Sequence, residues 1–489
     1  MDISRPLTCA PSATGLGAGV VIGVVAMGFD TYHEDFKTVS GTRVAYAWDM
    51  GWAPKVPPPG FTHGVEYTAA QLDAGAAPNF RDYEGEGTHS LGIAAGNGRA
   101  TGNSQPAGLY VGIAPEATLL VCRTYTPMTD QWVLEGVQWV MNRATTLGMP
   151  CVCLVCYASG QGAHDGSYQL DKDLTTLTGA GRLIVAPMGD NAGGHTSTDP
   201  AGTSSLVNFT IPSYVESTTS PEYITIEAWY RIDSGPYSVR VISPTGITIP
   251  PVATNTTSTP LDTVDGTIKV YNGVIDSGEP GGRNRKQIKV EVYRNTTTSP
   301  HPAVGTWGVE FTGQGKLDAW IGKWFFNTTG KPTFVMPDPT VEISSPASGY
   351  GVIAVGNYAH RRCWIDRNNH QSCNGLLASD MGKRLASSSR GPRADGYTAP
   401  VVVGPGTTVS SWGRDAPTSN AYKVMDGQHY YRYGGSQGAA HAVGVLGLAL
   451  EQDPTLTPDF ARARLEYWAG LSGWQAPTAG EGWGAVRIV

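Results

Sequence analysis

The residues with the clearest chemical potential surround Ser436. This serine lies in a run of small residues, 434–444, and an apolar run, 445–450, follows it. The pattern predicts a serine at the junction between a strand and a helix, where small residues let the two elements approach closely. A hydroxyl at that place lies at the positive end of the helix dipole, where developing negative charge is stabilised. Ser436 is therefore the first candidate for covalent chemistry.

Five segments resemble motifs of the subtilisin-like serine peptidases, in the order in which that family carries them. The run GGSQGAAHAVG around Ser436 is similar to the nucleophile motif G-T-S-M-A-A-P-H-V-A-G, with departures at Gly435, Gln437, Gly438 and Ala440. The other four segments are similar to the first core strand, the start of the active-site helix, the G-V-A-P-E-A segment and the S-S-R-G-P segment: residues 20–36, 86–96, 112–117 and 388–406. The resemblance implies an α/β fold with a doubly wound parallel sheet.

Residue by residue, the resemblance implies an altered active site. The triad aspartate of the family falls on Ala26, and its triad histidine falls on Glu86 rather than on His89. The oxyanion asparagine of the family falls on Asp190, or on Asn191 if the alignment slips by one residue. Of these four positions, only the serine keeps the residue of the family.

Two interpretations fit these substitutions. In the first, the chain is a pseudopeptidase in which Ser436 only caps the following helix, because triad residues act as a unit and losing one costs several orders of magnitude in rate. In the second, the substitutions are coordinated. The triad aspartate fixes the tautomer of a histidine and stabilises its cation, whereas Glu86 has no tautomer and becomes neutral when it accepts the serine proton. Because an aspartate beside Glu86 would raise its pKa by repulsion, its loss together with the histidine is chemically consistent.

Asp190 fits the second interpretation only if it is protonated. An oxyanion hole needs a hydrogen-bond donor, and a carboxylic acid donates whereas a carboxylate repels the developing charge. Glu, Asp and Ser at these positions resemble the sedolisins, serine-carboxyl endopeptidases that share the subtilisin fold and work in acid. Sedolisins carry a second aspartate one helical turn after the glutamate, where this chain has Ser90. Ser90, Glu84 and Asp82 are the candidates for orienting Glu86, and activity is expected to strengthen as the pH falls.

A substrate-binding segment is expected in residues 150–160, an apolar run that ends in a small-residue turn. It resembles the family strand that pairs with an extended substrate, and Cys156, Tyr157 and Ala158 fall on the part that walls the first specificity pocket. Strand addition uses main-chain hydrogen bonds. The resemblance therefore implies a peptide or protein substrate in an extended conformation.

No cofactor is required for this chemistry, and calcium is the candidate structural metal. Asp35 resembles a calcium ligand of the family, and the loop 97–108 would supply further oxygen ligands. The seven cysteines form no metal-ligand pattern, and Cys363 and Cys373, ten residues apart in a polar loop, are candidates for a disulfide.

The length of 489 residues predicts two domains. Residues 205–326 contain short alternating segments separated by Gly, Pro, Asn, Ser and Thr clusters, which is typical of an antiparallel β-sandwich. This insertion resembles the jelly-roll insert of a clostridial-type subtilase subgroup. We therefore predict a subtilisin-like domain in two parts, 1–203 and 333–489, with an inserted β-sandwich at 204–332. Bracing of the core, docking of a partner protein and restriction of substrate access are its candidate roles.

The net charge of −7 and the lack of a Lys/Arg-rich block argue against nucleic-acid binding, and no membrane interaction is expected. The apolar stretch 15–29 is preceded by one basic residue, Arg5, and supplies the first core strand, so we do not interpret it as a signal peptide. The chain is then intracellular or the mature fragment of a secreted protein.

Three functions are consistent with the sequence. The first is a serine peptidase that uses Ser436, Glu86 and Asp190. The second is an inactive pseudopeptidase that binds a peptide or a partner. The third is a dedicated peptide-maturation or acyl-transfer enzyme with a single substrate.

Overall fold

A mainly parallel sheet organises one end of the molecule. The computed structural model describes residues 15–486 apart from 52–55, 78–79, 126–127, 218, 232, 277–284, 297–298, 329, 471–477, 479 and 483. The eight strands of the sheet are all parallel to their neighbours except the last, and they lie in the order β23 (Val402–Pro405), β20 (Val352–Tyr358), β8 (Arg182–Pro187), β7 (Cys151–Val155), β1 (Val21–Ala26), β6 (Thr118–Arg123), β4 (Val44–Asp49), β5 (Val65–Thr68).

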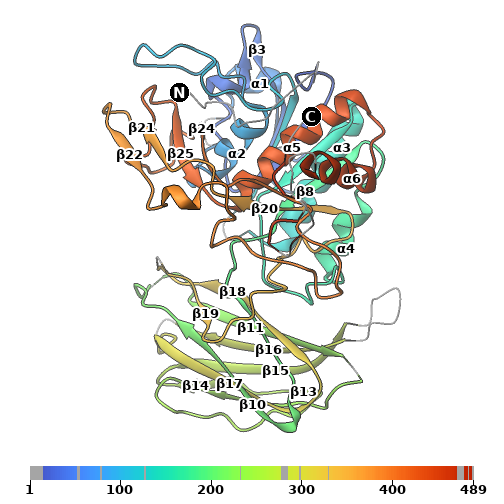
Figure 1. The fold of residues 1–489 in the computed structure, drawn as a ribbon, viewed down its shortest axis with the longest axis vertical. Coiled ribbons are helices and arrows are strands. Elements are labelled where there is room, and N and C mark those ends of the chain that lie inside the picture. Colours follow the sequence, from blue (N-terminus) through green and yellow to red (C-terminus); the bar gives the residue numbers. More distant parts are fainter. Residues whose placement is uncertain are drawn as a thin grey trace.

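Helices cover both faces of this sheet (Figure 1). Alternate residues of β1 pack in opposite directions: Ile22 and Val24 belong to one apolar cluster, Val21 and Val25 to another. The first cluster includes residues of α2 (Glu86–Ala95), α5 (Gly435–Gln452) and α6 (Pro458–Gly470), and the second includes residues of α3 (Asp130–Leu147) and α4 (Gln169–Thr176). A short helix, α1 (Ala69–Asp73), follows β5. This doubly wound arrangement confirms the predicted fold class.

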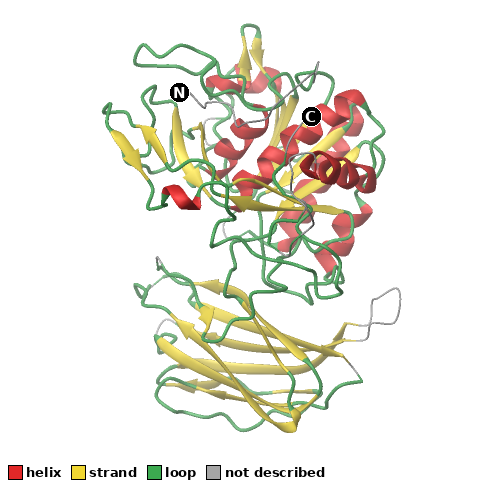
Figure 2. Ribbon diagram, viewed as in Figure 1, coloured by secondary structure: helices red, strands yellow, loops and turns green. Residues whose placement is uncertain are grey.

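The other end of the molecule is a β-sandwich, and Figure 2 shows its strands well apart from the helices. One sheet has the order β12 (Ser238–Ile242), β17 (Gly305–Gln314), β10 (Ala201–Ile211), β19 (Thr333–Phe334). The other has the order β13 (Thr256–Thr257), β15 (Gly266–Asp276), β16 (Arg285–Tyr293), β11 (Tyr223–Arg231), β18 (Leu317–Phe325), β9 (His195–Thr198), and β14 (Leu261–Thr263) also pairs with β15. The sandwich strands thus run from His195 to Phe334, and the exact domain boundaries stay a prediction.

The sandwich is joined to the α/β core by buried polar contacts. Glu227 of β11 accepts hydrogen bonds from the Gln161 side chain (3.1 Å) and from the backbone N–H of Gly162 (3.0 Å). The Trp320 ring of β18 stacks between His164 and His195, with centroid distances of 4.2 and 4.8 Å. A buried carboxylate with several donors is costly to separate from them. These contacts hold the insert against the core, and its three candidate roles stay predictions.

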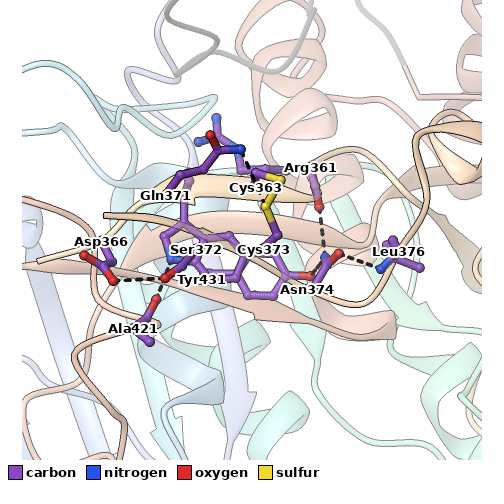
Figure 3. Close-up of a disulfide and its surroundings, with 11 residues drawn as sticks. Arg361, Cys363, Asp366, Gln371, Ser372, Cys373, Asn374, Leu376, Ala421 and Tyr431 are labelled. Carbon is purple, nitrogen blue, oxygen red and sulfur yellow. Dashed lines mark hydrogen bonds between the residues drawn. A yellow bond between two sulfur atoms is a disulfide. The ribbon is translucent and has the colours of Figure 1, made fainter. Parts of the chain in front are cut away.

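Three small hairpins complete the fold: β2 (Lys37–Thr38) with β3 (Gly41–Thr42), β21 (Cys363–Ile365) with β22 (Gln371–Cys373), and β24 (Thr407–Ser411) with β25 (His429–Tyr433). Cys363 and Cys373 form a disulfide across the β21–β22 pair (Figure 3). Among the described residues, no helix has the length and apolar character needed to cross a membrane.

Candidate active site

Glu86 is the first residue of α2, and the preceding loop fixes the start of this helix. Gly85 has φ of 75°, a left-handed conformation that favours glycine. The buried Asp82 carboxylate accepts hydrogen bonds from the backbone N–H groups of Gly85 (2.7 Å) and Thr88 (2.9 Å). Asp82 therefore satisfies helix N-terminal donors that would otherwise lack partners. It positions Glu86 through the backbone of α2, and among the described residues it forms no hydrogen bond with the Glu86 side chain.

Ser436 lies in the first turn of α5, directly after a glycine turn. Gly434 has φ of 147°, and a side chain at Gly404 would collide with the Gly438 carbonyl oxygen, so small residues are needed where β23 meets α5. The Ser436 hydroxyl donates a hydrogen bond of 2.7 Å to Glu86 Oε1. The structure therefore brings together two helix N-termini that are 350 residues apart in the chain. Small residues put the serine at this strand-to-helix junction, as its sequence context predicts.

The surroundings of the Glu86 carboxyl group shift its pKa in both directions. Burial raises its pKa, and the charges of Asp82 and Asp190 act in the same direction. The Arg432 guanidinium and the hydrogen bond from Ser436 lower it, and the net pKa is above the usual value. A carboxylate with a raised pKa is a stronger base than an ordinary glutamate, which suits proton abstraction from a hydroxyl.

The other positions of the expected machinery offer Glu86 no side-chain partner. Ala26, at the end of β1, is fully buried and has only a methyl group. The Glu84 side chain is exposed. The Ser90 hydroxyl is buried, and it lies near the Cys156 thiol, whose pKa it lowers. Neither Glu84 nor Ser90 forms a described hydrogen bond that would orient Glu86.

Asp190 lies beside the glycine turn that precedes Ser436. Its carboxylate accepts hydrogen bonds from the Gly435 backbone N–H (3.0 Å), the Asn357 amide (3.3 Å) and the Ser387 hydroxyl (3.3 Å). These are the contacts of an acceptor, whereas an oxyanion hole requires a donor. Asp190 is therefore bonded to the glycine turn that precedes Ser436.

Asn191, the alternative for the oxyanion position, makes structural contacts. Its side-chain amide donates to the Ser344 hydroxyl (2.9 Å), and its backbone N–H donates to the Ser389 hydroxyl (3.0 Å). It does not line the pocket that contains Ser436. The geometry therefore gives no support to the shifted alignment.

A pocket of about 210 Å³ opens next to the serine. Its lining includes Cys156, Tyr157 and Ala158, the segment expected to bind substrate. The other lining residues are Met27, Glu86, Met128, Pro187, Gly189, Asp190, Gly435 and Ser436. The Tyr157 hydroxyl donates to the Asp130 carboxylate at 2.7 Å, which anchors this side of the wall to α3. Nucleophile, candidate base and substrate segment thus share one cavity.

The two histidines of the neighbouring motifs are structural. The buried His89 ring packs edge-on against Tyr430 at 5.0 Å, and burial lowers its pKa. The His441 Nδ1–H donates to the Gln437 carbonyl oxygen at 2.8 Å, and burial lowers the pKa of His441 to about 3. Neither ring forms a described hydrogen bond with Ser436, whereas the Glu86 carboxylate accepts one from the Ser436 hydroxyl.

Asp35, the candidate calcium ligand, has protein partners. Its carboxylate accepts hydrogen bonds from the His429 ring (2.8 Å), the Ser411 hydroxyl (2.6 Å) and the Ala100 backbone N–H (2.9 Å). His429 also contacts the Asp426 carboxylate at 2.7 Å. Among the described residues, no group of three or more His, Cys, Asp or Glu side chains is arranged to hold a metal ion. The His429 ring thus lies where a bound cation would contact Asp35. A structural calcium in this protein stays a prediction.

Three residues near the site escaped the sequence interpretation: Asn357, Tyr430 and Arg432. Asn357 is the last residue but one of β20, and the other two lie in β25, only four to six residues before Ser436. Proximity to the serine in the sequence was the available signal for β25. Closeness in the sequence does not reveal that the β24–β25 hairpin directs these side chains toward the start of α2.

A serine at the N-terminus of a helix that packs on a doubly wound parallel sheet is the arrangement expected of a subtilisin-like fold. The family model described as the subtilase family matches residues 17–303 and 334–484. The chain therefore belongs to the subtilase family of serine peptidases.

One solved structure supports the fold of this assignment, and two others are matched at lower TM-scores. The CspB protease of Clostridium perfringens is similar with a TM-score of 0.75 and 21% identity, over 98% of this chain and 94% of that chain. The S41 psychrophilic protease and sphericase match with TM-scores of 0.43 and 0.44 and identities of 14% and 13%, over 97% and 98% of this chain and 92% and 95% of theirs.

Proposed function

We propose that this subtilase is a serine endopeptidase in which Ser436 is the nucleophile and Glu86 is the general base. The observation that carries the proposal is the 2.7 Å hydrogen bond from the Ser436 hydroxyl to Glu86 Oε1, with the donor and acceptor in the positions that proton transfer needs. The shared pocket with the segment 156–158 supports an extended peptide or protein as the substrate.

The proton balance of the reaction follows from these two side chains. As Ser436 Oγ bonds to the scissile carbonyl carbon, its proton passes to the Glu86 carboxylate, which becomes neutral. The neutral acid then returns the proton to the departing amine, and an acyl-enzyme remains on Ser436. A water molecule then attacks the acyl carbon and gives a proton to Glu86, which passes it to Ser436 Oγ as the carboxylic acid product leaves, so that the serine and the Glu86 carboxylate are both restored. Because no imidazolium forms, the aspartate missing at Ala26 has no charge to stabilise.

The oxyanion is proposed to bind at the N-terminus of α5, where the Ser436 backbone N–H and the helix dipole favour negative charge. The acid preference expected from the sequence required Asp190 to be a protonated donor. Its contacts with the Gly435 and Asn357 donors instead support a carboxylate that holds the serine turn. We therefore propose a rate that falls as the pH drops through the raised pKa of Glu86, because protonated Glu86 cannot accept the serine proton.

The test is reaction with a serine-directed phosphonate across a pH range from acid to neutral, with cleavage of a denatured protein followed by mass spectrometry. The parent chain should form an adduct at Ser436, and Ser436→Ala should form none. Absence of both adduct and cleavage over the whole range would refute the proposal.

One observation favours a second function, a peptide-binding pseudopeptidase. A carboxylate at Asp190 would repel the negative charge of a tetrahedral intermediate, and this would oppose catalysis while leaving the pocket available for binding. This function predicts that Ser436→Ala binds peptides as well as the parent does in fluorescence anisotropy, with neither chain cleaving them. A dedicated acyl-transfer reaction and a partner for the sandwich stay predictions.

A further inference from the structure

β25 carries two side chains that hold the segment directly before Glu86. The Tyr430 hydroxyl donates to the Gly85 carbonyl oxygen at 2.6 Å, and Arg432 Nη1 donates to the Glu84 carbonyl oxygen at 2.6 Å. The same Arg432 atom lies 3.5 Å from the Tyr430 hydroxyl. Two consecutive peptide groups at the start of α2 are therefore bound by one strand.

The same strand leads directly into the nucleophile turn. β25 ends at Tyr433, and Gly434, Gly435 and Ser436 follow without an intervening loop. Residues 430 and 432 lie on one face of the strand, because side chains alternate between faces. A single rigid element thus sets the position of Ser436 and of the backbone that carries Glu86.

The opposite face of β25 is fixed by the disulfide hairpin (Figure 3). The Tyr431 ring stacks on Trp364 with centroids 4.0 Å apart, and the Asn374 amide hydrogen-bonds to the Tyr431 hydroxyl. Asn374 follows Cys373 directly, so the crosslinked hairpin packs against the strand from behind. Tyr430 and Arg432 therefore project from a strand that is held on both faces.

We propose that Arg432 and Tyr430 are positioning residues for Glu86: together they fix the start of α2 against Ser436, and the Arg432 guanidinium, bound to the Glu84 carbonyl oxygen, places a positive charge at the start of the helix that carries Glu86. This inference rests on the proposed function. In a triad, an anionic aspartate supports a histidine that becomes cationic. Here a cationic arginine would support a glutamate that is anionic.

The charges around Glu86 support this assignment. The groups that interact with it come from five elements: Arg432 and Tyr430 of β25, Asp82 before α2, Asp190 after β8, Cys156 after β7 and Ser436 of α5. Arg432 is the cation among them, whereas Asp82 and Asp190 raise the Glu86 pKa. Burial raises the pKa of Tyr430 to about 12, so its hydroxyl stays a neutral donor. If the Arg432 charge is removed, burial and the charges of Asp82 and Asp190 still raise the pKa of Glu86, and the opposing effect of the arginine is lost.

The test measures the protonation of Glu86 separately from catalysis. Infrared difference spectra between the parent chain and Glu86→Gln report the protonated carboxyl band of Glu86 as the pH falls. Arg432→Gln should raise the midpoint of this titration by about one pH unit, and below the midpoint it should slow phosphonate labelling about tenfold. Arg432→Lys keeps the charge and should stay near the parent midpoint. Tyr430→Phe should keep the midpoint but reduce the plateau labelling rate several-fold.

Arg231→Gln is the matched control, because Arg231 is an exposed arginine of the sandwich and its loss should change neither quantity. Circular dichroism verifies that each variant is folded, and Arg432→Met replaces Arg432→Gln if the latter does not fold. An unchanged Glu86 midpoint in the folded charge-removing variant would overturn the inference, whether or not labelling occurs. A shifted midpoint without any adduct at Ser436 would support the charge effect and refute the proposed peptidase instead.

Discussion

Two carboxyl groups near β25, Glu86 and Asp35, have pKa values that are shifted in opposite directions. Burial opposes ionisation of both. At Asp35 the directly bonded His429 outweighs this cost and lowers the pKa to about 2. At Glu86 the cation is Arg432, which forms no described hydrogen bond with the carboxyl group, and the pKa stays raised. β25 supplies both cations, His429 and Arg432.

The difference separates a structural carboxylate from one suited to chemistry. Asp35 is fully paired, so its proton affinity is low and its contribution is to stability. Glu86 faces a neutral hydroxyl and is compensated only in part, so it retains the proton affinity that a general base needs. Substitutions at these two carboxyl groups and at their neighbours should therefore have different consequences.

Glu86→Gln should reduce the rate of phosphonate labelling at Ser436 by about 10⁴-fold, since removal of a catalytic base costs several orders of magnitude. The amide keeps the shape of the side chain but cannot take the serine proton. Stopped-flow or gel-based labelling rates measure the effect, and the melting temperature should change little. Glu84→Gln, at an exposed glutamate two residues away, is the matched control; an equal loss in both variants would contradict the assigned role.

His429→Gln should destabilise the protein by about 3 to 5 kcal/mol, because it leaves the Asp35 carboxylate buried without its cation. The pKa of His429 is raised to about 9 by Asp35 and Asp426 against the effect of burial. Its stabilising contribution is therefore complete below the unfolded pKa of about 6.5 and is lost as the pH rises through about 9. Denaturant unfolding at a series of pH values measures both effects.

His63→Gln is the control for that experiment. His63 is one-third exposed and lies 3.4 Å from Glu135, so its loss should cost less than about 1 kcal/mol. Equal stability of the parent and His429→Gln at pH 7 would show that the buried cation is unimportant to Asp35.

Asp190→Asn should accelerate labelling by up to about 100-fold, because an amide can donate to the oxyanion position and no longer repels its charge. It should also lower the Glu86 pKa by removing a nearby anion. The pH profile of the labelling rate shows both changes. Asn191→Ala should leave the rate unchanged, and a loss of rate in that variant would revive the shifted alignment of the oxyanion position.

Ala26→Asp should give no gain in rate. The new carboxyl group would be fully buried and would raise the Glu86 pKa by repulsion, so labelling in acid should slow by several-fold. This is the smallest of the four effects, and a labelling profile in parallel with the parent measures it. A large increase in rate would mean that a group other than Glu86 receives the serine proton.

The sequence was sufficient to predict the fold and the pairing of Ser436 with Glu86, because each lies within a motif that marks a helix N-terminus. Period-two alternation likewise predicted the strands β11, β12, β15 and β16. The roles of Arg432 and Tyr430 could not be predicted, because they depend on how a hairpin packs against α2 rather than on spacing in the chain. Asp35 shows the same limit: its partner His429 lies 394 residues away, and a single aspartate does not reveal whether it binds calcium or an imidazolium.

The most direct test of Glu86 as the base compares two midpoints on one preparation. One is the pH midpoint of the Ser436 labelling rate, with the adduct mapped by peptide mass spectrometry, and the other is the infrared titration midpoint of the Glu86 carboxyl group. Base catalysis by Glu86 predicts that the two midpoints coincide above the ordinary glutamate pKa and move together in Arg432→Gln. A labelling rate that does not follow Glu86 ionisation, or a serine that never reacts, would contradict it.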